Sequence, residues 1–271
     1  MNAPLPLDVA LQAETGLALA GQGLAFAYGS RPPIFEGVSL AVHHREIVCL
    51  LGGSGCGKST LLRTMAGLAL PTRGSVAFLG QALTRPHPRA ALVFQHASLL
   101  PWLNVARNVG FGLNFKHQPQ IDRDTRDERI AQALAGVGLA DKAHLYPLQL
   151  SGGMAQRVAL ARAMARQPQM LLADEPFSAL DAISRAEMQS LLVDLVHRWH
   201  TAVLLVTHDI DEAILVADRI LLMGAPGGGP GRIVREWVVD IERPRHDHVA
   251  AAAALRLEIV GALQRLLTVI A

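Results

Sequence analysis

The sequence of 271 residues predicts an α/β fold with a parallel sheet, and two observations carry this prediction. Short, fully apolar runs at 170–173 and 202–206 are typical of buried parallel strands, and a helical pattern at 183–198 separates them. Upstream, an apolar run at 46–51 ends in a glycine-rich loop, and a helical pattern at 59–68 follows. Strands that alternate with helices in this way are the units from which parallel sheets are built.

The N-terminal part of the chain predicts β structure of another kind. Residues 17–48 divide into short strand-like runs, with turn residues at 21–23 and 29–33 between them. Turns this short join neighbouring strands that run in opposite directions. We therefore expect an antiparallel β region before the parallel sheet begins.

The glycine-rich loop carries a motif that agrees with its position between a predicted strand and a predicted helix. Its residues are Gly52, Gly53, Ser54, Gly55, Cys56, Gly57, Lys58, Ser59 and Thr60, which fit G-x-x-x-x-G-K-[ST]. The glycines let main-chain N–H groups point at phosphate oxygens, Lys58 adds a positive charge, and the Ser59 hydroxyl can bind Mg²⁺. A plain glycine turn is the alternative, and the flanking strand and helix argue against it. The motif predicts a P-loop that binds a nucleoside triphosphate.

The run at 170–173 ends in two carboxylates, Asp174 and Glu175, followed by Pro176. Ligands of open α/β sheets bind at the carboxyl ends of the strands. One carboxylate can hold Mg²⁺, here Asp174, and the next can take a proton from the attacking water, here Glu175. Taken alone, such a pair is more often a solvated strand end, but the P-loop upstream favours the catalytic interpretation.

Between about 95 and 167 the pattern changes to helices, at 122–137 and 153–166 among others. We interpret this stretch as an inserted helical subdomain, 96–165, within a discontinuous core, 1–95 and 166–240. Another strand is expected at 232–239, and 241–271 is expected to be a helical tail. Its charges Arg256, Glu258 and Arg265 are expected on one side of an amphipathic helix.

At 150–157 the sequence reads Leu-Ser-Gly-Gly-Met-Ala-Gln-Arg, which resembles the signature motif of ABC transporter ATPases. The resemblance covers nearly the whole chain. Tyr28 is similar to the adenine-stacking A-loop residue, Gln95 to the Q-loop, 174–175 to the Walker B pair, 178–181 to the D-loop with Asp181, and His208 to the H-loop. Without the resemblance, Tyr28 reads as a core aromatic, Gln95 as a strand-end amide and His208 as an ordinary packed or solvated histidine.

The resemblance implies a P-loop NTPase (RecA-like) core with ATP and Mg²⁺ as cofactors, in which Gln95 also contacts the metal and His208 the γ-phosphate. Ser151, Gly152 and Gly153 open a helix, so their N–H groups form a second anion site. In the family this site closes over nucleotide held by a second ATP-binding subunit. Two departures stand out, Gly53 where many relatives carry proline and Ala155 where arginine or glutamine is common, and neither removes an essential side chain.

Within the family, 101–105, 174–181 and 230–234 resemble the nitrate, sulfonate and taurine importer group. The implied partners are a second ATP-binding subunit, most simply a copy of this chain, transmembrane permease subunits and, indirectly, a periplasmic or extracellular solute-binding protein. No apolar run reaches the roughly 18 residues that span a bilayer, so another chain would supply the span. The implied location is the cytoplasmic face of the inner membrane, which agrees with two cysteines that lack disulfide or metal spacing.

Large apolar side chains follow Gln95 closely, at 99–103 and at Val109, Phe111, Leu113 and Phe115. They predict either an interface with a membrane subunit or an apolar seam that holds the helical subdomain to the core.

The main rival function is a soluble ABC ATPase that works as a scaffold or on nucleic acid. Lys and Arg number 25 against 23 Asp and Glu, without a basic stripe, which argues against a nucleic-acid partner. A P-loop kinase is a second rival, and the motif at 150–157 argues against it.

Overall fold

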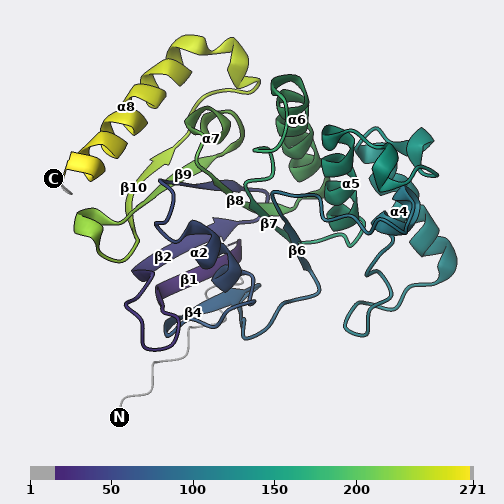
Figure 1. The fold of residues 1–271 in the computed structure, drawn as a ribbon, viewed down its shortest axis with the longest axis horizontal. Helices are drawn as coiled ribbons and strands as arrows, with labels where there is room; N and C mark the ends of the chain where they lie inside the picture. The colour runs from purple at the N-terminus through teal and green to yellow at the C-terminus, as the bar shows by residue number, and fades with distance from the viewer. Residues whose placement is uncertain (1–15, 269–271) are drawn as a thin grey trace.

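The computed structural model describes residues 16–268 and contains two sheets surrounded by helices (Figure 1). The strands are β1 (Leu17–Phe26), β2 (Phe35–His43), β3 (Ile47–Leu51), β4 (Arg73–Phe78), β5 (Gln81–Ala82), β6 (Ala90–Val93), β7 (Met170–Asp174), β8 (Ala202–Thr207), β9 (Arg219–Gly224) and β10 (Arg232–Val238). The helices are α2 (Lys58–Met65), α3 (Val105–Val109), α4 (Arg123–Gly136), α5 (Gly152–Met164), α6 (Ala182–Trp199), α7 (Ile210–Val216) and α8 (Val249–Thr268). Four short 3₁₀ turns connect them: η1 (Ala140–Lys142), η2 (Pro147–Gln149), η3 (Pro226–Gly228) and η4 (Arg245–Asp247).

The two sheets confirm the predicted α/β fold. The first has the order β2-β1-β4-β5 and is antiparallel throughout, which confirms the expected N-terminal β region. The second has the order β10-β9-β3-β8-β7-β6, and its strands are parallel except for β10. Because β3, β8 and β7 are adjacent and parallel, the segments that follow them emerge at one edge of the sheet.

The fully apolar strands follow from burial on both faces of the second sheet. In β3, Ile47, Cys49 and Leu51 pack against the helical side, whereas Val48 and Leu50 face α2 and the antiparallel sheet. All five of these residues are at most 1% exposed. A strand that faces two cores has no place for a polar side chain, which explains the absence of alternation.

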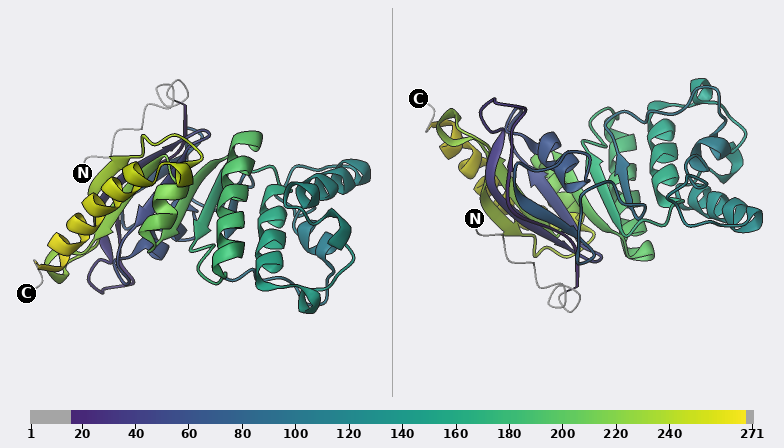
Figure 2. Two further views of the ribbon diagram at one scale, coloured as in Figure 1. Left: turned by 90° about the horizontal axis from the view of Figure 1, so that it is seen from above. Right: turned by 90° about the horizontal axis from the view of Figure 1, so that it is seen from below.

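Helices α3, α4 and α5 lie together at the end of the molecule opposite α8 (Figure 2). Asn104, Asp122 and Ser151 cap the starts of the three helices, each by accepting a main-chain N–H three residues on. Val109, Leu113 and Leu134 are buried between them. The division of the chain at 95, 165 and 240 stays a prediction, and its outermost residues, 1–15 and 269–271, lie outside the described part.

The structure differs from the sequence-based expectations at three places. Helix α2 ends at Met65 rather than at 68, because Gly67 is left-handed (φ 71°) and Leu68 N–H donates to Arg63 O, which closes the helix. Strands β4, β5 and β9 and helix α7 had no predicted counterpart. All four are short, and a run of seven residues or fewer gives too little periodicity to assign.

The third difference concerns the tail. The expectation that Arg256 and Glu258 share one side of the helix is wrong, because Arg256 pairs with Asp211 in the first turn of α7, while Glu258 pairs with Arg235 of β10. Residues that are two positions apart in a helix point in directions about 200° apart, so these two charges face different neighbours. No helix within residues 16–268 is long and apolar enough to cross a membrane.

Candidate functional site

The glycine-rich loop connects β3 to α2 at the carboxyl edge of the parallel sheet. Gly55 (φ 84°) and Gly57 (φ 100°) are left-handed, and Gly57 caps the start of α2. A Cβ on Gly52 would lie 2.2 Å from the main-chain oxygen of Met223, so the loop passes β9 only with glycine there. At Gly53 a Cβ would meet nothing within 4 Å, so this departure from the proline of many relatives has no effect on packing.

The loop presents donors for an anion. Among the described residues, the N–H groups of Gly53, Ser54 and Gly55 donate no hydrogen bond. The Lys58 side chain is buried, and its Nζ donates to Gly52 O and Gly53 O, both at 2.8 Å. The loop thus has free N–H groups next to a lysine ammonium whose hydrogen bonds go only to loop carbonyls. Such donors can bind the oxygens of a polyphosphate.

Two further residues of the motif, Cys56 and Thr60, make contacts within the loop and the helix that follows it. The Cys56 thiol turns inward, donates to Gly53 O at 3.2 Å, and has its pKa raised by burial. Thr60 lies in the first turn of α2, where its carbonyl accepts the Thr64 hydroxyl at 3.0 Å. The assignment of Cys56 and Thr60 to the nucleotide-binding loop stays a prediction.

Ser59 and Asp174 are 115 positions apart in sequence but form a hydrogen bond in the structure. The Ser59 hydroxyl donates to Asp174 Oδ1 at 2.9 Å, and it does so at the point where α2 begins and β7 ends. A hydroxyl and a carboxylate oxygen are hard ligands of the kind that Mg²⁺ prefers. The donor set therefore fits the metal that the sequence implies.

Glu175 and His208 lie beside this pair. His208 Nδ1 is 3.1 Å from Glu175 Oε1, and the histidine follows β8 directly. Glu175 is left-handed (φ 47°), although it is not glycine. Its N–H donates to Val206 O at 2.9 Å, and its carbonyl accepts the Ser178 hydroxyl at 2.9 Å. These bonds hold a backbone conformation that costs about 1 to 3 kcal/mol for a residue with a side chain, and such residues concentrate at functional sites.

Tyr28 and Gln95 are placed less tightly. Tyr28 follows β1, is half exposed, and touches Phe26 edge-on with ring centroids 4.9 Å apart, so it is not the core aromatic that its strand position alone would suggest. Gln95 comes two residues after β6 and is exposed. No contact among the described residues joins Gln95 to Ser59 or Asp174.

Two helix N-termini form a second cluster. Ser151 is exposed and caps α5 by accepting Met154 N–H at 3.2 Å. A Cβ on Gly153 would lie 2.9 Å from Ser184 Oγ in α6, so the two helices begin side by side. The Asp181 carboxylate caps the start of α6 by accepting two main-chain N–H groups. These hydrogen bonds hold the pKa of its carboxyl below the usual value. Within the described residues, no contact joins this cluster to the loop at 52–60.

A protein-family model described as ABC transporter matches residues 35–178, and the match contains the glycine-rich loop, Gln95, the segment at 150–157 and the acidic pair. The chain belongs to the ABC transporter family. It is thus an ATPase whose cofactors are ATP and Mg²⁺, as the loop and the Ser59–Asp174 pair led us to expect.

Several curated proteins are similar to this ABC ATPase. The aliphatic sulfonates import ATP-binding proteins of Burkholderia lata and Granulibacter bethesdensis are each 49% identical to it, over 88% and 85% of the chain and 84% and 88% of their own lengths. One from Pseudomonas aeruginosa is 48% identical over 88% of the chain and 94% of its own length. Among solved structures, an ATP-binding cassette in a dimeric, post-hydrolysis state with ADP and Pi aligns with a TM-score of 0.69 at 30% identity, over 82% of this chain and 98% of that one.

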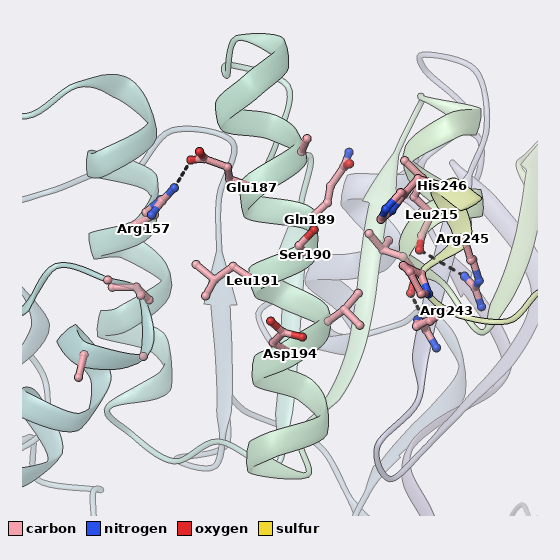
Figure 3. Close-up of a pocket in the computed structure, with 18 residues that line it drawn as sticks. Arg157, Glu187, Gln189, Ser190, Leu191, Asp194, Leu215, Arg243, Arg245 and His246 are labelled. Atoms are coloured by element: carbon pink, nitrogen blue, oxygen red, sulfur yellow. Dashed lines mark hydrogen bonds and ion pairs between the residues drawn. The ribbon is translucent and has the colours of Figure 1, made fainter. Parts of the chain in front are cut away.

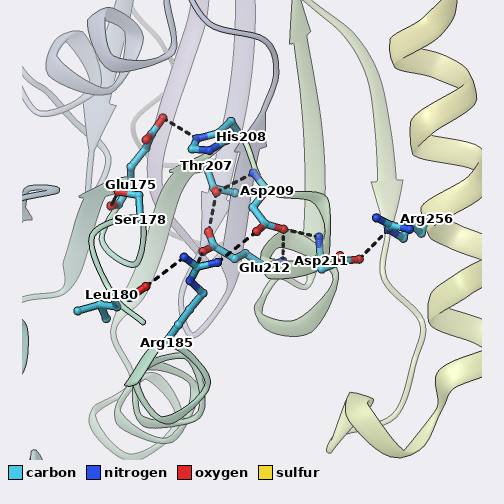
Figure 4. A network of polar contacts seen from close by, with 10 residues as sticks. All are labelled: Glu175, Ser178, Leu180, Arg185, Thr207, His208, Asp209, Asp211, Glu212 and Arg256. Atoms are coloured by element: carbon cyan, nitrogen blue, oxygen red, sulfur yellow. Dashed lines mark hydrogen bonds and ion pairs between the residues drawn. The ribbon is translucent and has the colours of Figure 1, made fainter. Parts of the chain in front are cut away.

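The ABC ATPase also contains site residues that sequence reasoning missed. Arg185 of α6 reaches Asp209 and Glu212 at the start of α7, and Glu212 accepts the Thr207 hydroxyl at 2.6 Å (Figure 4). The segment 207–209 was singled out for His208 alone, and nothing in the sequence pattern links it to Arg185.

A hollow of the ABC ATPase lies elsewhere, along α6 (Figure 3). It has a volume of about 960 Å³, with the Arg157–Glu187 ion pair on one side and Arg243 and Arg245 on the other. Arg245 is buried and donates to the carbonyl of Ile214 at 2.8 Å, among others, and burial lowers its pKa to about 10. The hollow contains none of the predicted site residues.

Proposed function

We propose that this chain is the ATP-hydrolysing subunit of an importer for aliphatic sulfonates, with taurine and nitrate as the related anions to compare. The observation that carries the ATPase assignment is the convergence of Ser59–Asp174 and Glu175–His208 at one edge of the parallel sheet. The substrate class is supported by the names of the similar curated proteins.

In the proposed site, the N–H groups of 52–60 and Lys58 bind the phosphates of ATP. Ser59 and Asp174 hold Mg²⁺, with Gln95 as a further ligand, and the bound metal neutralises charge on the phosphate oxygens. Tyr28 offers an exposed ring face on which the adenine stacks.

Glu175 takes the proton of the attacking water, because its carboxylate follows the metal-binding aspartate directly and its side chain, 25% exposed, is still open to a water molecule. His208 donates to the γ-phosphate and, through Nδ1, keeps the Glu175 carboxylate in place. A carboxylate and an imidazole at hydrogen-bond distance can move a proton and orient a water without rearranging the chain.

The cluster at Ser151, Gly152 and Gly153 is the second anion site. The start of α5 has unpaired N–H groups and a positive dipole end, and Ser151 is exposed there. Since this cluster does not touch its own phosphate loop, we infer that it closes over ATP held by a second subunit, with Asp181 at the same interface. ATP then binds two copies of the chain together, and its hydrolysis releases them.

A groove beside Gln95 is our candidate for the site of the membrane subunit. It has a volume of about 330 Å³ and lies between the core and the helical end, with Leu68, Phe94 and Phe115 in its lining. Each of these three side chains is at least 43% exposed. Trp102 does not line the groove, but it is 69% exposed and follows Gln95 closely, so we include it in the candidate surface. Val109 and Leu113, by contrast, are buried in the core. Part of the apolar set therefore holds the helices to the core, and we propose that the exposed part contacts the membrane subunit.

Replacing Trp102 with Asp is expected to lower uptake by the assembled transporter at least about tenfold, because a charge would be placed in an apolar contact. ATP binding and the melting temperature of the isolated chain should not change, since the side chain is largely exposed. Leu257→Asp on α8 is the matched control, because Leu257 is similarly exposed on an element far from the groove. A Trp102→Asp chain that fails to fold, or that supports normal uptake, would contradict the docking site.

The importer assignment is tested by uptake in a strain that lacks this chain. Uptake of a labelled aliphatic sulfonate should be lost and should return with the wild-type chain but not with Lys58→Ala, while nitrate uptake stays unchanged. Loss of nitrate uptake alone would contradict the substrate class.

Membrane association is tested by fractionation. The chain should sediment with membranes only when its permease partner is co-expressed, as expected for a peripheral subunit on the cytoplasmic face. A chain that stays in the supernatant in both cases would favour the soluble scaffold.

A further inference from the structure

Glu212 is a buried acid behind the candidate catalytic site, and the proposed mechanism does not use it. It lies in the first turn of α7 and is 4% exposed. Its Oε2 accepts the hydroxyl of Thr207 at 2.6 Å, and Thr207, itself 1% exposed, immediately precedes His208. A buried acid is thus one hydrogen bond away from the backbone that carries the histidine.

Arg185 connects this acid to a different segment of the chain. Its Nη2 donates to Leu180 O at 3.1 Å, next to Asp181 at the start of α6. Its Nε lies 3.7 Å from Glu212 Oε1, and its Nη1 lies 3.7 Å from Asp209 Oδ2 (Figure 4). One guanidinium therefore contacts both the segment at 178–181, which we place at the subunit interface, and the segment at 207–212, which contains His208.

The connection is incomplete in the isolated chain. Arg185 Nε is buried and has no hydrogen-bond partner, although Glu212 Oε1 faces it. Both ion-pair distances exceed the 2.7 to 3.2 Å that an N–H···O hydrogen bond requires. A buried N–H without a partner is unfavourable, so a shift of α6 toward α7 by less than about 1 Å would stabilise the network.

A purely structural role for Arg185 would be to hold the start of α7. Asp209 already does this, because its Oδ1 accepts the N–H groups of Asp211 and Glu212 at 2.9 and 3.2 Å. Burial raises the pKa of Glu212, and the Asp209 charge acts in the same direction, whereas the Thr207 hydrogen bond and the Arg185 charge lower it. The contribution left for Arg185 is to stabilise the charged, correctly oriented form of Glu212.

We propose that Arg185 is a positioning residue that acts through Glu212 and Thr207 on His208, and so links the placement of 178–181 at the subunit interface to the catalytic histidine. The link rests on the proposed function, since it needs His208 at the γ-phosphate. Closure of a second subunit against 178–181 moves Leu180, completes the Arg185–Glu212 hydrogen bond, and fixes the backbone of 207–208.

The test compares Arg185→Gln with Arg256→Gln. Both remove a guanidinium bound to a carboxylate at the start of α7, but Arg256 reaches only the exposed Asp211. Arg185→Gln should lower kcat about tenfold, with KM for ATP and the melting temperature unchanged, because a misplaced catalytic group affects the chemical step. Arg185→Lys keeps the charge without the planar fork and should lower kcat by an intermediate factor. A kcat within about twofold of wild type for Arg185→Gln, or an equal loss in Arg256→Gln, would overturn the proposal.

A double variant separates positioning from support of the fold. In a His208→Ala background, measured under single-turnover conditions, Arg185→Gln should change the residual rate by less than about twofold, since the group it positions is gone. A further tenfold loss would mean that Arg185 acts independently of His208, and the link would be wrong. A His208→Ala chain with wild-type activity would instead overturn the proposed role of His208 itself, so the two failures are distinguishable.

Discussion

Glu175→Gln is expected to lower steady-state ATP hydrolysis by about 10²- to 10⁴-fold, because an amide cannot accept the proton of the attacking water. ATP binding should persist, since the phosphate loop is untouched and the amide oxygen can still accept from His208 Nδ1, now 3.1 Å from the carboxylate. The variant should therefore accumulate as an ATP-bound dimer. Hydrolysis is measured as phosphate release, and the dimer by size-exclusion chromatography with and without ATP.

The matched control for this substitution is Glu258→Gln on α8. Its carboxylate is also hydrogen-bonded, to Arg235 and Trp237, but it lies far from the parallel sheet edge that carries Asp174. This variant should hydrolyse ATP at the wild-type rate. Normal hydrolysis by Glu175→Gln would show that another group takes the proton.

Mixing two inactive variants should restore activity, and this is the second large effect that we expect. Lys58→Ala removes the charge of the phosphate loop, and Ser151→Phe blocks the second anion site with a side chain on an exposed position. Each homodimer is then defective at both ATP sites. In a mixed dimer, one site combines the intact loop of one subunit with the intact Ser151 of the other.

About half of the dimers in an equimolar mixture are mixed, and one of their two sites is intact, so the recovered rate should be about a quarter of wild type if sites act independently. Each variant alone should remain near background. Recovery fails if one chain builds the whole site by itself, since no mixture then contains an intact site. A brisk ATPase rate from a monomer of the Ser151→Phe chain would contradict the shared site equally well.

The sequence alone predicts most of the fold because local rules agree with one another. The two-sided burial of β3, β7 and β8 makes their sequences fully apolar, and the turn residues between them mark the boundaries. Gly55 and Gly57 have left-handed backbones that residues with a side chain rarely adopt, so the phosphate loop is readable without a structure. Where the pattern is short, as in β9 and α7, periodicity is insufficient and these elements were not assigned.

The candidate site is predictable only in part, for a different physical reason. Asp174 and Ser59 are found from strand-end and loop positions, but their contact depends on the sheet order. Arg185 and Glu212 are an ordinary helix arginine and glutamate in sequence, and only tertiary packing brings them behind Thr207. The misassigned charges of the tail have another cause, because the 200° between Arg256 and Glu258 follows from helix geometry alone and did not require the structure.

At Glu175, with its left-handed backbone, the residue that would be best for stability differs from the residue that the proposed chemistry requires. Glycine there would relax the main chain and is expected to make the fold more resistant to heat, while removing the carboxylate that we propose as the group that deprotonates water. Selection for thermal stability alone would therefore favour glycine at this position and yield a protein that does not hydrolyse ATP. The carboxylate at this position is explained by a requirement for ATP hydrolysis rather than by a requirement for stability.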